Sequence, residues 1–262
     1  MPEHRHRKHL GQHFLHDPAI IERIINAVSP RPGQTIFEIG PGAGAITVPL
    51  LQRCGELYAV EMDKTVVPLL QRQCEGVGVL HLHRGDVLKL DVDAFLPEQP
   101  ERVRLVGNLP YNISTPLFFH LARYLHRFQD LHVMVQKEVA ERIVSPPNSK
   151  QYGRLSVMMQ YYFEAYILFH IGPGAFNPPP KVDSSVVFLK PHEQVPVDVG
   201  NVALFKEIVA AAFAQRRKTI RNALKNKVSS AVLEIAAVDP GCRAENLSLA
   251  DFAAISRAAY MH

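Results

Sequence analysis

Seven short runs dominated by apolar residues mark the first 190 positions of the chain. Each is rich in Val, Ile, Leu or Phe and is bounded by Gly, Pro, Asn or Asp, a pattern typical of strands buried in a sheet. The predicted strands are residues 35–39, 57–60, 79–83, 103–106, 131–136, 165–171 and 184–189.

Between these runs, apolar residues recur at spacings of three and four, which predicts helices. The first helix follows an Asp17-Pro18 pair that suits a helix start. Its apolar face consists of Ile20, Ile21, Ile24, Ile25 and Val28. Further helices are expected after Gly44, from Met62-Asp63, through residues 118–121 and over residues 137–144. Strands that alternate with helices indicate an α/β fold.

The pattern changes after Lys190. Residues 191–200 are typical of a linker, and the remainder is helical in pattern and rich in alanine. One helix face consists of Phe205, Ile208, Val209, Ala212 and Phe213. We therefore expect two domains, at residues 1–190 and 200–262, of which the second is small and helical.

Two regions concentrate positive charge in a chain of net charge +4 and pI ≈ 9.0. The first is a basic arm at residues 4–9, and the second is a cluster directly after the helix face. The cluster consists of Arg216, Arg217, Lys218, Arg221, Lys225 and Lys227. Both are interpreted as contacts to RNA phosphates, with a solvated tail and a solvated helix face as the alternatives.

Composition and cysteine spacing exclude several classes of protein. Apolar residues make up 47% and charged residues 21%, as in ordinary globular proteins. Cys54, Cys74 and Cys242 are scattered, without the spacing of a disulfide framework or a zinc site. No apolar run is long enough to span a membrane, and the N-terminus lacks a secretion signal. We expect a cytoplasmic protein with a retained N-terminus and no membrane partner.

A glycine turn follows the first predicted strand, with Gly40, Gly42 and Gly44 at G-x-G-x-G spacing. A strand, a glycine turn and a helix form a nucleotide-binding unit in which backbone amides approach the ligand closely. Glu38 lies inside the strand just ahead of the turn. A carboxylate there repels a pyrophosphate but suits a cation, which favours S-adenosylmethionine over a dinucleotide.

Polar residues also follow the next three strands. Glu61 lies where an acid bonds ribose hydroxyls, and Asp86 is placed to accept a hydrogen bond from the adenine amine of a cofactor. Each acid alone is more often an ordinary loop residue. Together with Asn108 after the fourth strand, they indicate a site at the carboxyl edge of the sheet.

The tetrapeptide Asn108-Leu109-Pro110-Tyr111 suits methylation of an exocyclic adenine amine. The Asn108 amide oxygen and a carbonyl of Leu109 or Pro110 would each accept one N–H, which frees the nitrogen lone pair and stabilises the positive charge that develops during transfer. Tyr111 would stack on a base that has left its helix. The alternative is an ordinary Asn/Pro turn.

A proline-rich loop at residues 172–184 carries one aromatic residue, Phe176. A loop stiffened by proline can hold Phe176 as a stacking surface opposite Tyr111, or it can form a rigid hairpin connection with a buried Phe. The cluster Met158, Met159, Tyr161, Tyr162 and Phe163 is interpreted as core packing rather than as a cofactor site.

These motifs together resemble the small-subunit (16S) ribosomal RNA adenine N6,N6-dimethyltransferase family. The resemblance runs from Lys8 to Asn226 and rests on residues 11–15, 38–44, 61, 85–86, 108–111 and 176–184. Residues 213–222 are similar to the signature of the family's second domain.

The resemblance implies a Rossmann-like class I methyltransferase sheet, largely parallel with an antiparallel last strand, and a C-terminal all-helical domain that binds rRNA. It implies S-adenosyl-L-methionine as the cofactor. Because the sulfonium already activates the methyl group, we expect no metal. The implied reaction dimethylates two adjacent adenines in the 3′-terminal hairpin loop of 16S rRNA, coupled to subunit maturation. The implied partner is the small ribosomal subunit or its precursor, and we expect a monomer.

The same resemblance assigns the site residues. The substrate set is Asn108, Leu109, Pro110, Tyr111 and Phe176. The cofactor set is Gln12, His13, Leu15, Glu38, Gly40, Gly42, Gly44, Glu61, Met62, Asp86, Val87 and Asn108. His13 stands where many relatives have Asn; both can donate a hydrogen bond, and His adds a possible pH sensitivity.

Three other functions would account for parts of the sequence. A resistance-type methyltransferase of large-subunit rRNA would share the first domain, but the Asn108–Tyr111 form and residues 215–222 argue against it. A non-enzymatic assembly factor would not need the acids and Asn108. A nicotinamide oxidoreductase gives Glu38 no role.

Overall fold

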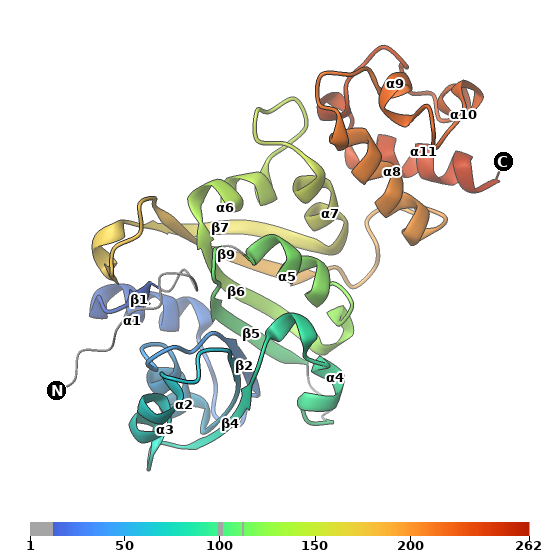
Figure 1. Cartoon of the computed structure of the whole chain (residues 1–262). Helices are drawn as coiled ribbons and strands as arrows, with labels where there is room; N and C mark the ends of the chain where they lie inside the picture. Colours follow the sequence, from blue (N-terminus) through green and yellow to red (C-terminus); the bar gives the residue numbers. More distant parts are fainter. Residues whose placement is uncertain (1–12, 99–101, 112, 262) are drawn as a thin grey trace. The chain divides into compact units, whose positions relative to one another are not determined.

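The computed structural model describes residues 13–98, 102–111 and 113–261. Its main sheet has seven strands in the order β4-β3-β2-β5-β6-β9-β7 (Figure 1). The strands are β2 (Ile36–Ile39), β3 (Glu56–Glu61), β4 (Val79–Arg84), β5 (Val103–Asn108), β6 (Phe128–Gln136), β7 (Phe163–Ile171) and β9 (Ser184–Pro191). All seven predicted strands are present, with bounds that differ by a few residues.

The central part of the sheet is parallel. β2 pairs in parallel with β3 and β5, β3 with β4, and β5 with β6, whereas β9 runs antiparallel to β6. This confirms the expected sheet with an antiparallel last strand. The register sets Ile39 opposite Val60 and Gly107, so the residues that follow β2, β3 and β5 meet at one edge. Ligands of open α/β sheets bind at that edge.

Helices of the first part of the chain pack against this sheet. They are α1 (Pro18–Val28), α2 (Thr47–Cys54), α3 (Val67–Cys74), α4 (Val92–Phe95) and α5 (Ser114–Leu121). Asp17 caps α1 by accepting hydrogen bonds from the backbone N–H groups of Ala19 (2.9 Å) and Ile20 (3.3 Å), as its sequence predicts. The α3 helix begins at Val67 rather than at Met62-Asp63, because a turn closed by Val66 N–H to Asp63 O (3.3 Å) precedes it.

A separate two-stranded sheet joins distant segments. β1 (Phe14–Leu15) pairs antiparallel with β8 (Phe176–Asn177), with Leu15 opposite Phe176. The His16 N–H extends the pairing by donating to Ala175 O at 3.0 Å. The segment ahead of α1 is therefore bound to the proline-rich loop.

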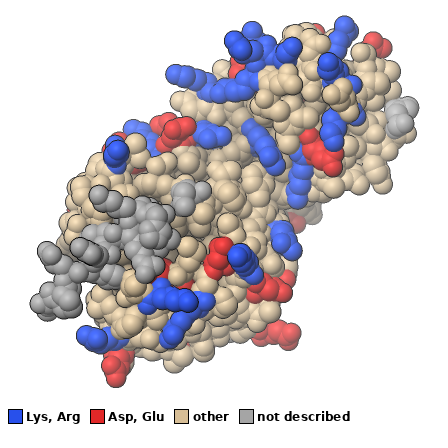
Figure 2. Space-filling model, in the orientation of Figure 1, with Lys and Arg blue, Asp and Glu red and all other residues tan. Residues whose placement is uncertain are grey.

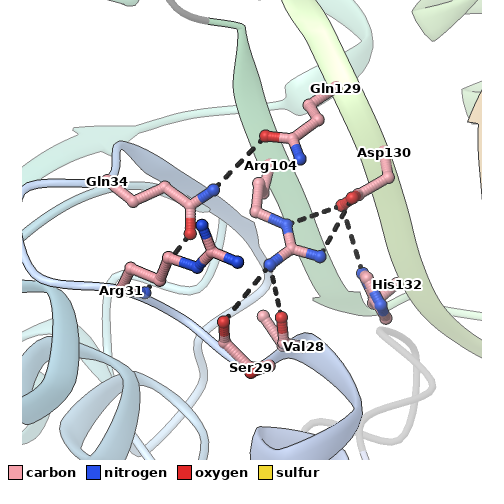
Figure 3. Close-up of polar contacts among 8 residues, drawn as sticks. All are labelled: Val28, Ser29, Arg31, Gln34, Arg104, Gln129, Asp130 and His132. Atoms are coloured by element: carbon pink, nitrogen blue, oxygen red, sulfur yellow. Dashed lines mark hydrogen bonds and ion pairs between the residues drawn. The ribbon is translucent and has the colours of Figure 1, made fainter.

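The end of α1 is attached to the strands at the opposite edge of the sheet from the glycine turn. Arg104 on β5 donates from Nε and Nη2 to the two carboxylate oxygens of Asp130 on β6, both at 2.9 Å (Figure 3). The guanidinium also donates to the carbonyls of Val28 and Ser29, which end the helix. His132 Nδ1 lies 3.4 Å from Asp130 Oδ1. The Arg104 guanidinium thus ties α1 to two strands.

The chain divides into two compact units. The first comprises Met1–Ala140 and Tyr166–Pro191, and the second comprises Glu141–Ala165 and His192–His262. α6 (Lys137–Val144) directly follows β6 and continues into the second unit. The other helices of the second unit are α7 (Arg154–Tyr162), α8 (Val202–Ala214), α9 (Ile220–Leu224), α10 (Ser230–Ile235) and α11 (Leu249–Met261). The domain limits expected at residues 190 and 200 stay a prediction.

Aromatic side chains form the core of the second unit. The Phe213 ring packs against Tyr152 and Phe252, and the buried Tyr152 hydroxyl donates to Leu247 O at 2.9 Å. The apolar cluster predicted as core packing is buried: Met158, Met159, Tyr161, Tyr162 and Phe163. Within the described residues, no helix is long and apolar enough to cross a membrane.

Candidate cofactor and substrate site

Two adjoining, partly open cavities lie at the carboxyl edge of the sheet in the first unit. Both are lined by Gly40, Glu61 and Pro110, so they form one connected site. The first cavity extends toward His13 and Tyr111, and the second extends away from them along β3 and β4.

Two glycines of the turn line the site: Gly40 lines both cavities and Gly42 lines the first. Gly40 has φ +70°, a conformation that favours glycine, and a Cβ there would lie 3.4 Å from the Asn108 carbonyl. A Cβ on Gly42 would lie 3.1 Å from the Phe14 ring. The turn therefore packs closely under Phe14 and beside the tetrapeptide.

Glu38 is almost fully enclosed, with 2% of its surface exposed, and it lines the first cavity. Its Oε2 atom has no hydrogen-bond partner among the described residues. Burial raises the pKa of Glu38 to about 8; the Thr47 hydroxyl opposes this shift and the charge of Glu61 adds to it. A cation in the cavity would stabilise the ionised form of Glu38.

Glu61 holds the glycine turn in place. Its Oε2 accepts from Gly42 N–H at 3.0 Å, and its Oε1 accepts from Asp63 N–H at 2.7 Å. Burial raises the pKa of this carboxyl even though these two bonds oppose the shift. Each carboxylate oxygen has a second lone pair, so Glu61 can accept ribose hydroxyls as well.

Asp86 lies in the wall of the second cavity, ahead of the short helix η2 (Val87–Lys89). Its Oδ1 accepts from Leu88 N–H at 3.0 Å, which fixes the carboxylate and leaves Oδ2 to receive an amine. Met62, which is 54% exposed, and the buried Val87 line the same cavity. An acid beside apolar side chains suits a purine ring with an exocyclic amine.

The Asn108 side chain is oriented by the segment ahead of α1. Its Nδ2 donates to the His13 carbonyl at 3.1 Å, so Oδ1 remains an acceptor. The Pro110 carbonyl already accepts from Ile113 N–H (3.1 Å) and Ser114 Oγ (3.0 Å). Of the two carbonyls considered from the sequence, that of Leu109 is therefore the better acceptor for a target amine.

Tyr111 is held on two sides. Its hydroxyl lies 2.7 Å from Ser184 Oγ, and its ring stacks on the His13 imidazole with centroids 5.5 Å apart and planes inclined by 29°. His13 Nδ1 is 2.7 Å from Pro178 O and therefore carries the hydrogen. The ring that was predicted to stack on a base is thus fixed beside the first cavity.

Most of the predicted site residues line the two cavities. These are His13, Leu15, Glu38, Gly40, Gly42, Glu61, Met62, Asp86, Val87, Asn108, Leu109, Pro110 and Tyr111. Gly44 does not line them; it is buried, and a Cβ on it would lie 3.0 Å from Gln73 Oε1 of α3. Gln12 and the basic arm at residues 4–9 lie outside the described residues.

Phe176 takes the buried arrangement of the two that were considered. Its side chain is 2% exposed and belongs to the same apolar cluster as Leu15 and Val186. The reason is the β1–β8 pairing, which sets Phe176 opposite Leu15. The expected exposed ring opposite Tyr111 is not seen here, and contact between Phe176 and a base stays a prediction.

Several cavity residues were not predicted. Phe14 and Ile46 line the first cavity, and Leu88 and Ile113 line the second. The position of Phe14 between two predicted residues was the available signal. The others are apolar residues in ordinary helical or turn sequences, which look the same as core residues.

The six basic residues of the predicted cluster are all exposed, and Figure 2 shows blue side chains gathered on the visible face of the helical unit. Arg216 lies 3.4 Å from Glu245, and Lys227 lies 2.6 Å from Glu207. The other four form no ion pair with an acid in the described part of the chain. Unpaired exposed cations are suited to phosphate contact.

Known proteins resemble this chain over most of its length. The sequence model of a family described as ribosomal RNA adenine dimethylase matches residues 3–260. A Pseudomonas putida protein named ribosomal RNA small subunit methyltransferase A is 48% identical over 250 residues, 95% of this chain and 93% of that protein. A Methylococcus capsulatus protein of the same name is 49% identical over 254 residues, 97% and 98% of the two chains.

A solved structure is also similar. A dimethyladenosine transferase from Plasmodium falciparum superposes with a TM-score of 0.78 at 26% identity, covering 93% of this chain and 96% of that one. The family match extends over nearly the whole sequence, through both compact units. The chain belongs to the ribosomal RNA adenine dimethylase family.

Proposed function

We propose that this protein transfers methyl groups from S-adenosyl-L-methionine to the N6 amines of two adjacent adenines in the 3′-terminal hairpin loop of 16S rRNA. The observation that carries the proposal is the meeting of Glu38, Glu61, Asp86 and Asn108 at one connected site, in a chain of the adenine dimethylase family.

The donor set suits this cofactor. Glu38, buried and without a partner on Oε2, would face the positive charge, Glu61 would accept from the ribose hydroxyls, and Asp86 would accept from the adenine amine. Because Gly40 and Gly42 have no side chains, the space between these acids stays open for the cofactor. When bound, S-adenosylmethionine supplies a methyl group already activated by its sulfonium.

The substrate amine would be held by two acceptors. Asn108 Oδ1, oriented by the bond from Nδ2 to the His13 carbonyl, would accept one hydrogen, and the Leu109 carbonyl the other. Both oxygens would attract the positive charge that develops on the nitrogen. Tyr111 would stack on the base. Catalysis would rest on positioning and on complementary charge, without a strongly tuned general base.

The small ribosomal subunit or its precursor is the proposed substrate particle. Relatives at 48% and 49% identity are named small subunit methyltransferases, which supports this choice. The exposed basic residues of the helical unit, Arg217, Lys218, Arg221 and Lys225, would contact the RNA backbone. Methylation would accompany maturation of the subunit.

The test is transfer of labelled methyl from S-adenosylmethionine to small subunits that lack the modification. Large subunits and bare RNA are run in parallel, and the product nucleoside is identified. Dimethyladenosine on small-subunit rRNA alone is the expected result. Label on large-subunit rRNA would identify a resistance-type enzyme instead, and tight binding without label would identify an assembly factor.

A further inference from the structure

Tyr111 lies in a turn, yet its ring has a fixed place. It follows β5 by three residues and precedes α5, so its backbone is not paired in the sheet. The His13 imidazole covers the ring at 5.5 Å, and the hydroxyl lies 2.7 Å from Ser184 Oγ. The hydroxyl contact is the only one of the two that reaches a strand of the main sheet.

Ser184 is a rigid anchor. It is 0% exposed, it begins β9, and its backbone is paired with Gln136 of β6. The residue before it is held too, since Lys137 N–H donates to Asp183 O at 2.9 Å. A hydroxyl on this paired strand fixes the phenol oxygen of Tyr111, and stacking on His13 restricts the tilt of the ring.

We propose that Ser184 is a positioning residue of the target-base site, which sets the Tyr111 ring in the orientation that receives the adenine. It acts through Tyr111 and touches neither cofactor nor reacting atoms. The inference rests on the proposed function, because it assigns the stacking role to Tyr111.

Burial raises the pKa of the Tyr111 phenol, and the bond to Ser184 only partly offsets this, so the phenol stays protonated at neutral pH. The hydroxyl can therefore act as a donor as well as an acceptor toward Ser184. Loss of the partner would leave a half-buried hydroxyl unsatisfied, and the ring would sample other rotamers.

The adjacent Ser185 provides a matched control. It is also 0% exposed, lies on the same strand and makes one side-chain hydrogen bond, to His170 Nδ1 at 2.8 Å. Successive residues of a strand point to opposite faces of the sheet, so this bond lies away from Tyr111. Ser184→Ala and Ser185→Ala therefore remove equivalent bonds, of which one reaches the site.

The experiment measures kcat and KM for unmodified small ribosomal subunits, with the affinity for S-adenosylmethionine determined separately by calorimetry. We expect Ser184→Ala to lower kcat/KM for subunits about three- to tenfold, with cofactor affinity within about twofold of wild type. Ser184→Thr, which keeps the hydroxyl, should restore activity, and Ser185→Ala should match wild type. Tyr111→Phe should show the loss of Ser184→Ala, and the double variant no further loss.

Equal kcat/KM values for Ser184→Ala and Ser185→Ala in an active enzyme would overturn the inference while leaving the proposed function intact. So would additive losses in the double variant, or a Ser184→Thr variant as impaired as Ser184→Ala. A wild-type protein that methylates no subunit rRNA would overturn the proposed function and this inference with it.

Discussion

Arg104 and Asp130 form a two-pronged ion pair between neighbouring strands, with side chains that are only 12% and 7% exposed. Both nitrogen–oxygen distances are 2.9 Å, and the same guanidinium donates to the last carbonyls of α1. The pair therefore joins a helix end to β5 and β6 at the sheet edge that faces away from the ligand site (Figure 3).

Replacing Arg104 by Ala should destabilise the first unit by about 3–5 kcal/mol, because the Asp130 carboxylate would stay buried without its cation. Arg53→Ala is the control, since exposed Arg53 bonds only the Asn26 side chain among the residues that the structure describes, and it should cost less than about 0.5 kcal/mol. Thermal melts of the two variants make the comparison. Equal melting temperatures would show that the buried pair contributes no more than a surface contact.

Acid should weaken this pair only at low pH, because the Asp130 carboxyl resists protonation. Burial alone would raise the pKa of Asp130, but the neighbouring His132 and the hydrogen bonds and charge of Arg104 outweigh burial and lower it. A lowered pKa gives stability that is full above the unfolded value of about 3.9 and is lost as pH falls through the folded value. Asp130→Asn should therefore melt at a lower temperature than the wild type at neutral pH, and its melting temperature should fall less steeply as the pH is lowered. Melts from about pH 6 to about pH 3 measure both effects. Melting temperatures that fall in parallel for the two proteins would contradict this assignment.

Cofactor affinity should depend on pH through Glu38. With its pKa raised to about 8 by burial, Glu38 is protonated in the free protein at neutral pH, and a bound cation favours the carboxylate. Binding therefore releases a proton below about pH 8, and affinity rises with pH by up to about tenfold per unit until that value. Calorimetry in buffers of different ionisation enthalpy measures the released proton.

Two controls isolate the charge of Glu38. Glu38→Gln keeps the shape and removes the titration, so its affinity should vary little with pH. Methylthioadenosine has neither the ammonium nor the sulfonium, and its affinity for the wild-type protein should not follow the same curve. If the neutral nucleoside shows the same slope, another group governs the dependence.

Asn108 should matter more for turnover than for cofactor binding. Asn108→Ala removes the Oδ1 acceptor and the bond from Nδ2 to the His13 carbonyl, and kcat should fall about 10²- to 10³-fold. Asn108→Asp keeps an acceptor but loses the donor to His13, so its kcat should lie between those of the wild type and Asn108→Ala. Single-turnover methyl transfer to unmodified small subunits measures the effect. Undiminished turnover in Asn108→Ala would refute the two-acceptor account.

Sequence patterns predicted the centre of the sheet well because β2, β5, β6 and β9 are largely buried on both faces and therefore appear as nearly continuous apolar runs. The acids at the carboxyl ends of the strands could be predicted for a related reason. Parallel pairing brings these ends to one edge of the sheet, so polar residues at the ends are expected to lie close together there. Glu38 and Glu61 both line the cavity where this argument puts them.

Contacts between distant segments could not be predicted in the same way. The burial of Phe176 depends on its pairing with Leu15, and no local pattern records that pairing. The same holds for the Tyr111–Ser184 bond and for the grouping of residues 141–165 with the C-terminal helices. The occupied Pro110 carbonyl follows from the turn geometry at Ile113 and Ser114, which residue types alone do not determine.

The bond from Asn108 to His13 uses the main chain of His13, not its imidazole. A change of amino acid at position 13 therefore alters the stacking against Tyr111 and the bond to Pro178 but leaves the acceptor of the Asn108 amide in place. Position 108 has no such freedom, because its own side chain makes the contact. The two positions therefore tolerate mutation differently: residue 13 can vary in type while the orientation of the Asn108 amide is preserved.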